Sequence, residues 1–191
     1  NLNFFDYNIT NLNLSNFLNL DDFSKNDFLY YKNKNGCDSE REHEAYGTGS
    51  TGKSGFINCF YTNATSLNNK ISELTSRLSL VSLPHLVFMT ETWFCPTSAP
   101  RIDGYVLYRW DRPSRGGGVA IYVRDDIVSV EIAEGELIGG EVEQVWCGLA
   151  FGVDRILVGC IYRPPKKNGD GQVLSSDEAL FRSLRGARRL V

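Results

Sequence analysis

The stretch between residues 56 and 90 constrains the fold most, because a helix pattern lies between two strand patterns. Residues 56–62 and 86–90 are short apolar runs typical of buried strands. Between them, apolar side chains recur at spacings of four, three, four and three residues, which predicts a helix over 67–81 with Ser66 as its N-cap. These side chains are Leu67, Ile71, Leu74, Leu78 and Val81. A strand–helix–strand unit predicts parallel strands joined by a right-handed crossover.

The first polar side chains after these two strands are expected to lie at one edge of the sheet. Asn63 follows the first strand, and Glu91 follows the second. Parallel strands bring their carboxyl ends to the same side, which is where open α/β sheets carry their sites. A carboxylate there is the oxygen ligand that a hard divalent cation requires. Taken alone, Glu91 favours the simpler interpretation of a solvated side chain that opens a loop, and only the surrounding motifs favour a site.

The chain between residues 92 and 165 is dominated by strand patterns. Strands are predicted at 105–109, 119–123, 127–133, 144–151 and 155–162. Their spacing favours antiparallel pairing after the first parallel pair, so we expect a mixed sheet with a helix against one face. If the last strand is parallel to the first two, Tyr162 reaches the same edge as Asn63 and Glu91. Ser176 is expected to cap a final helix.

Residues 1–55 are predicted to stand apart from a folded domain at 56–191. The first 35 residues are rich in Asn and keep neither helical nor strand periodicity, which indicates disorder, with prion-like assembly as the functional alternative. Residues 47–54 match the P-loop pattern. A P-loop joins a buried strand to a helix, whereas here a polar stretch precedes and a strand pattern follows, so nucleotide binding is disfavoured.

Composition and charge set broad limits. A chain of 191 residues can bury one core, and its net charge of −3 identifies no partner. Cys59, Cys147 and Cys160 fall in apolar strands without paired spacing, which predicts buried free thiols in a reducing compartment. No apolar run has the length of a membrane-spanning helix and no signal peptide is visible, so we expect an intracellular, nuclear or cytoplasmic protein. The chain starts at Asn1 and stops inside a helical pattern, and we expect a fragment.

Five arginines lie among aromatic side chains between residues 101 and 124, namely Arg101, Arg109, Arg112, Arg115 and Arg124. They are candidates for contacts with a nucleic-acid backbone. The alternative is that they pair with the aspartates of the same stretch along a sheet edge, and such mixtures of charge favour this alternative.

Four motifs in this order and spacing resemble the amino-terminal half of the endonuclease encoded by non-LTR (LINE-type) retrotransposons, a member of the endonuclease/exonuclease/phosphatase superfamily. The resemblance covers residues 56–165. The motifs are Thr62-Asn63-Ala64-Thr65-Ser66-Leu67-Asn68-Asn69-Lys70, Thr90-Glu91-Thr92-Trp93, Asp111-Arg112 with Arg115-Gly116-Gly117-Gly118-Val119-Ala120-Ile121-Tyr122-Val123, and Tyr162-Arg163-Pro164-Pro165.

The resemblance implies the amino-terminal half of a two-sheet α/β sandwich and Mg²⁺-dependent cleavage of a DNA phosphodiester. It assigns the metal to Glu91, a hydrogen bond near the phosphate or the catalytic aspartate to Asn63, and donation to a phosphate oxygen to Tyr162. These roles suit their chemistry, because the metal acts as a Lewis acid and neutral donors stabilise developing charge. The implied partners are duplex DNA and, in the parent protein, a carboxyl-terminal reverse transcriptase and the element RNA.

The chain also departs from the pattern of this family. Thr65 stands where the family usually has Arg, and the Gly-Asp-x-Asn and Ser-Asp-His motifs are missing. No His follows His85, so no imidazole is predicted to activate water. We therefore expect an inactive fragment that lacks the second sheet, with a non-catalytic DNA-binding remnant as the alternative.

Overall fold

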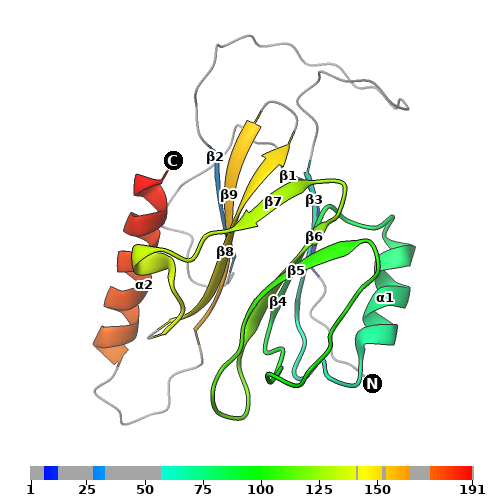
Figure 1. Ribbon diagram of the computed structural model, residues 1–191, viewed down its shortest axis with the longest axis horizontal. Coiled ribbons are helices and arrows are strands. Elements are labelled where there is room, and N and C mark those ends of the chain that lie inside the picture. Colours follow the sequence, from blue (N-terminus) through cyan, green and yellow to red (C-terminus); the bar gives the residue numbers. More distant parts are fainter. Residues whose placement is uncertain are drawn as a thin grey trace.

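The computed structural model describes residues 7–12, 28–32, 57–140, 142–151, 154–163 and 173–190. Two β-sheets pack face to face, and one helix covers the outer side of each (Figure 1). The predicted α/β class is therefore confirmed.

The first sheet is mixed and contains the predicted parallel pair. Its strands, in spatial order, are β1 (Tyr7–Leu12), β3 (Ile57–Asn63), β4 (Leu86–Thr90), β6 (Val119–Arg124) and β5 (Tyr105–Trp110). β3 and β4 are parallel, with Asn63 opposite Thr90, and the other pairs are antiparallel. Asn63 is the last residue of β3 and Glu91 follows β4, so both lie at the same edge, as the sequence predicts.

The expectation that the second sheet is missing is wrong. Its strands, in spatial order, are β2 (Phe28–Lys32), β9 (Asp154–Tyr162), β8 (Glu143–Phe151) and β7 (Val128–Glu131), and all pairs are antiparallel. The strands predicted at 127–133, 144–151 and 155–162 thus form a separate layer instead of extending one mixed sheet. Local pattern specifies that a strand exists, whereas its pairing partner depends on contacts distant in sequence.

Two stretches of the segment predicted to be disordered are strands in the structure. β1 pairs with β3 at one edge of the first sheet, and β2 pairs with β9 at one edge of the second. The prediction of disorder therefore differs from the structure at 7–12 and 28–32. The P-loop pattern at 47–54 lies outside the described residues.

The two helices begin at other residues than predicted. α1 (Ile71–Leu80) has Lys70 at its N-cap, and Ser66 lies before it with a φ of +77°. The chain before α1 is instead bound to the end of β4, where the Ala64 N–H donates to the Thr90 carbonyl (2.8 Å). α2 (Val173–Arg189) starts before Ser176, so that residue lies inside the helix. A short 3₁₀ helix, η2 (Gly135–Leu137), precedes β8.

The main core lies between the sheets, and each helix seals one outer face. Phe88 and Ile121 of the first sheet pack in one cluster with Val158 of the second. Outside the first sheet, Leu74 and Leu78 of α1 are fully buried in a second cluster. Outside the second sheet, Trp146, Leu157 and Ile161 pack with Ala179 and Ala187 of α2. Figure 1 shows α1 and α2 on opposite sides of this sandwich.

The prediction of buried free thiols is confirmed for three of the cysteines. Cys59, Cys147 and Cys160 are free and buried, and burial raises the pKa of Cys59 to about 12. Cys95 is free and exposed. Among the described residues, no helix has the length and apolar character needed to cross a membrane.

Candidate functional site

The loops that follow β3 and β4 carry unusual backbone conformations. Thr65, Ser66, Glu91 and Trp93 all have φ between +40° and +77°, a region that residues other than glycine rarely adopt. The loops hold each other in place, because the Ser66 N–H donates to the Glu91 carbonyl (2.9 Å). Backbone strain of this kind persists only where surrounding contacts enforce it, and it is often found at functional sites.

Neutral donors surround the Glu91 carboxylate. The Tyr162 hydroxyl donates to Oε1, the Trp93 Nε1–H donates to Oε2 (2.7 Å), and the Gly117 N–H donates weakly to Oε2 (3.4 Å). Partial burial tends to raise the pKa of Glu91, but these hydrogen bonds and the charge of Arg112 outweigh it, so the pKa lies below its usual value. The carboxylate is therefore ionised at neutral pH.

Tyr162 reaches this carboxylate from the second sheet. β9 pairs with β8 in the opposite layer from β3 and β4, so it is not a neighbour of the parallel pair, although it runs in the same direction as β4, with Cys160 against Met89 and Tyr162 against Glu91. The side chain nevertheless arrives at Glu91, because the end of β9 lies across the core from the end of β4. Burial, the bond to Glu91 and the nearby negative charges raise the pKa of Tyr162, so its phenol remains a donor.

Asn63 lies at the same edge but turns its amide oxygen into its own loop. The backbone N–H and the hydroxyl of Thr65 both donate to Asn63 Oδ1, each at 3.2 Å. The Lys70 ammonium supports the same loop by donating to the Ala64 and Thr65 carbonyls at 3.3 and 3.2 Å. The structure thus brings Glu91 and Tyr162 into contact and leaves Asn63 bonded within its loop.

An ion pair that the sequence analysis missed lies beside Tyr162. Glu143 opposes Tyr162 in the β8–β9 register, is only 6% exposed, and pairs with Arg112. The Gly118 N–H donates to the second oxygen of Glu143 at 2.6 Å. One sequence signal was present, since Glu143 is the charged residue at the start of an apolar strand.

The three-glycine turn fits closely against both carboxylates. Gly116, Gly117 and Gly118 have φ of +93°, +66° and +83°, which a glycine adopts without strain. A Cβ atom on Gly117 would lie 2.5 Å from Glu143 Oε2. Because the turn lies so close, it can direct one backbone N–H to Glu91 and the next to Glu143.

Among the described residues at this edge, Glu91 provides the one carboxylate that is available to bind a magnesium ion. Within the described part of the chain, no group of three or more His, Cys, Asp and Glu side chains could hold a metal. Arg112 and Gly118 occupy the oxygens of Glu143, whereas Glu91 has only neutral donors at hydrogen-bond distance. Mg²⁺ is often held by one or two carboxylates together with waters and substrate phosphates, and Glu91 meets that minimum.

His85 lies at the opposite end of β4 from Glu91. Its Nδ1 accepts the Asn58 N–H at 2.9 Å, and burial together with Arg124 lowers its pKa. In the described ranges, no imidazole is therefore placed at the Glu91 edge.

Most of the five arginines pair with carboxylates. Arg101, Arg109 and Arg124 contact Asp103, Asp111 and Asp126 at 3.2, 3.4 and 2.7 Å. These are pairs of the kind expected if the arginines bind the aspartates of the same stretch and not a nucleic acid. Arg112 instead pairs with Glu143, and Arg115 stacks on the ring of Trp93, with its Cζ 5.7 Å from the ring centroid.

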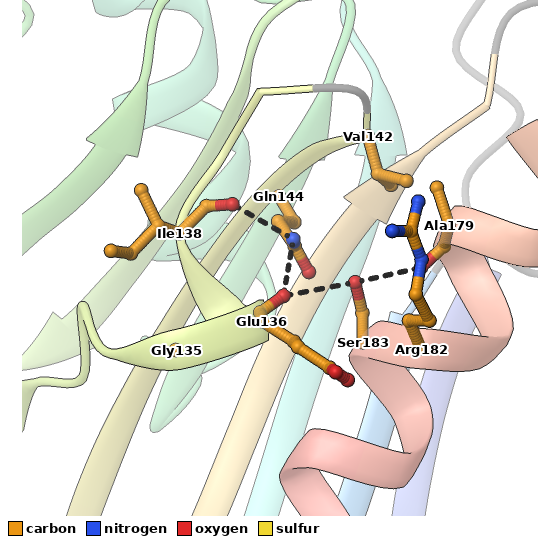
Figure 2. A pocket seen from close by; sticks show the side chains of 8 residues that line it. All are labelled: Gly135, Glu136, Ile138, Val142, Gln144, Ala179, Arg182 and Ser183. Atoms are coloured by element: carbon orange, nitrogen blue, oxygen red, sulfur yellow. Dashed lines mark hydrogen bonds between the residues drawn. The ribbon is translucent and has the colours of Figure 1, made fainter.

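A cavity of about 250 Å³ lies away from this edge, between η2 and α2 (Figure 2). Gln144 Nε2 donates to the carbonyls of Glu136 (3.0 Å) and Ile138 (3.1 Å), and the Ser183 hydroxyl donates to the Glu136 carbonyl (3.1 Å). Because these buried polar groups already have partners, the cavity offers a ligand few free hydrogen-bonding groups.

No protein-family model matches the sequence, and no curated protein matches it. Functional assignment therefore depends on the chemistry of the Glu91 edge.

Proposed function

We propose that the chain belongs to a Mg²⁺-dependent DNA endonuclease domain of the kind carried by non-LTR retrotransposons, with Glu91 as the metal ligand. The contact between Glu91 and Tyr162 is the main support, because these side chains are 71 residues apart and come from different sheets. The two-sheet α/β architecture agrees with the fold that the resemblance implies. Duplex DNA would be the substrate, and a reverse transcriptase and element RNA would be partners in the parent protein.

Each side chain at this edge has a role that its environment supports. Glu91 is ionised and is oriented by Trp93 and Gly117, so it is prepared to ligate a cation. Tyr162 stays protonated and can transfer its hydrogen bond from Glu91 to a phosphate oxygen. Bound Mg²⁺ would supply Lewis-acid polarisation of that phosphate.

We propose that these 191 residues do not turn over DNA by themselves. The described residues place neither an imidazole nor a second unpaired carboxylate beside Glu91, so a general base next to the proposed metal ligand is missing from them. Incubation of supercoiled plasmid with Mg²⁺ should give no nicking above background. Nicking that disappears in Glu91→Ala would contradict the proposed inactivity and support the site.

The metal assignment can be tested by magnesium titration monitored by tryptophan fluorescence. Trp93 donates to Glu91, so cation binding at that carboxylate should alter its emission, and Trp93→Phe identifies that contribution. The response should disappear in Glu91→Gln and persist in Asp103→Asn, a control that removes a carboxylate 95% exposed. A response that survives in Glu91→Gln, or no response in the unaltered chain, would refute the assignment.

Non-catalytic DNA binding through the whole arginine stretch has less support. Arg101, Arg109 and Arg124 already pair with neighbouring aspartates, which reduces the positive charge available to a phosphate backbone.

A further inference from the structure

Arg115 differs from the other arginines of its stretch because no carboxylate is paired with it among the described residues. Arg101, Arg109, Arg112 and Arg124 each have a carboxylate partner. Arg115 is exposed, and its only described interaction is the stacking on Trp93. It is therefore a cation that remains available to a ligand.

Trp93 connects this cation to the candidate site. The edge of its indole donates to Glu91, while its face lies under the Arg115 guanidinium. The Trp93 backbone is fixed by the Trp93 N–H, which donates to the Gly117 carbonyl (2.9 Å), and by Asn68 Nδ2, which donates to the Trp93 carbonyl (2.7 Å). One anchored ring thus positions an anion on its edge and a cation on its face.

Charge balance explains why a phosphate would need this cation. Glu91 is negative and has only neutral donors in contact, so an approaching phosphate is repelled. The charge of Arg112 is matched by Glu143, and the Lys70 ammonium is bonded to two loop carbonyls. Arg115 can offset this repulsion without breaking an ion pair.

We infer that Arg115, held on the face of Trp93, binds a backbone phosphate of DNA beside the phosphate that faces Glu91. A guanidinium can direct two N–H groups to phosphate oxygens while its plane stays on an aromatic ring. The inference rests on the proposed function for its choice of DNA, but the phosphate contact itself requires no metal.

The contact is tested by fluorescence anisotropy of a labelled DNA duplex with the full chain in EDTA, over a series of salt concentrations. Loss of one phosphate contact should lower the slope of log K against log salt by about 0.9. Arg115→Gln should therefore weaken binding by about tenfold at about 50 mM salt. The control, Arg101→Gln, removes a side chain 86% exposed that pairs with Asp103, and should change affinity by less than about twofold.

Arg115→Lys should keep the salt slope and bind with intermediate affinity, because it retains the charge and loses the planar fork. Equal losses of affinity in Arg115→Gln and Arg101→Gln, or no duplex binding by the unaltered chain at about 50 mM salt, would overturn the inference.

A loss of affinity specific to Arg115→Gln, without a magnesium response at Glu91, would refute the proposed nuclease function and still support the phosphate contact of Arg115. Thermal melting of each variant verifies folding.

Discussion

Glu91 and Glu143 are two carboxylates at the same edge of the sandwich, one from each sheet, and their surroundings differ. Glu143 is almost fully buried and is neutralised by Arg112, with Gly118 as a further donor. Glu91 is less buried and has only the neutral groups of Tyr162, Trp93 and Gly117 in contact. A carboxylate with a bound counter-ion holds structure together, whereas one oriented by neutral donors keeps a charge that a cation can use.

Removing the counter-ion of Glu143 should have the largest effect. In Arg112→Ala the carboxylate would stay buried without a partner, so we expect the free energy of unfolding to fall by about 3 kcal/mol in urea denaturation. The double variant Arg112→Ala/Glu143→Gln should recover a large part of this loss, since the unpaired charge is gone. A loss below about 1 kcal/mol in the single variant would mean that the pair is a weak surface contact.

The glycine turn that separates the two carboxylates should be the next most sensitive element. Gly117→Ala would place a Cβ 2.5 Å from Glu143 and 2.6 Å from the Arg112 side chain at a φ of +66°, so we expect a loss of about 2 kcal/mol. Gly104→Ala is the matched control, because Gly104 also has a positive φ (+81°) and nothing lies within 4 Å of its added carbon. Thermal melting should separate the two variants, and equal melting temperatures would contradict the close fit of the turn.

The hydroxyl of Tyr162 should have a smaller effect that depends on pH. The folded-state pKa of Glu91 lies below its ordinary value of 4.5, so the stabilisation from this carboxylate is present above that pH and is lost as pH falls through the folded pKa. Tyr162→Phe should cost about 1 kcal/mol at neutral pH and progressively less in acid.

A second tyrosine serves as the control for that pH dependence. The Tyr105 hydroxyl donates to the Pro84 carbonyl (2.7 Å), which does not titrate, so Tyr105→Phe should cost the same at pH 7 and in acid. Urea denaturation of both variants at neutral and acidic pH makes the comparison. A Tyr162→Phe loss that does not change with pH would contradict the bond to ionised Glu91.

The sequence predicts those parts of the fold that depend on local pattern. Periodicity located β3, α1 and β4, and the parallel pairing of β3 and β4 placed Asn63 and Glu91 at one edge. The helix starts were less predictable. Ser66 has the chemistry of an N-cap, but its N–H is bound to the Glu91 carbonyl, and the helix begins only after Lys70.

The other parts depend on contacts between distant residues. The sequence of β9 is typical of a buried strand in any sheet, and only its pairing with β8 assigns it to the second layer. Glu143 was not recognised because its partner Arg112 lies 31 residues away and nearer aspartates were available. Asn63 was correctly located, yet the direction of its amide depends on the Thr65 hydroxyl two residues away.

Because Glu91 and Tyr162 stand on opposite layers, the spacing of the interior sets the geometry of the site. Phe88, Ile121 and Val158 fill the space between those layers and are almost fully buried. A change in the distance between the sheets would separate or crowd the Glu91 carboxylate and the Tyr162 hydroxyl, even if every strand stayed intact. The packing between the sheets thus sets the distance between these two side chains and also stabilises the fold.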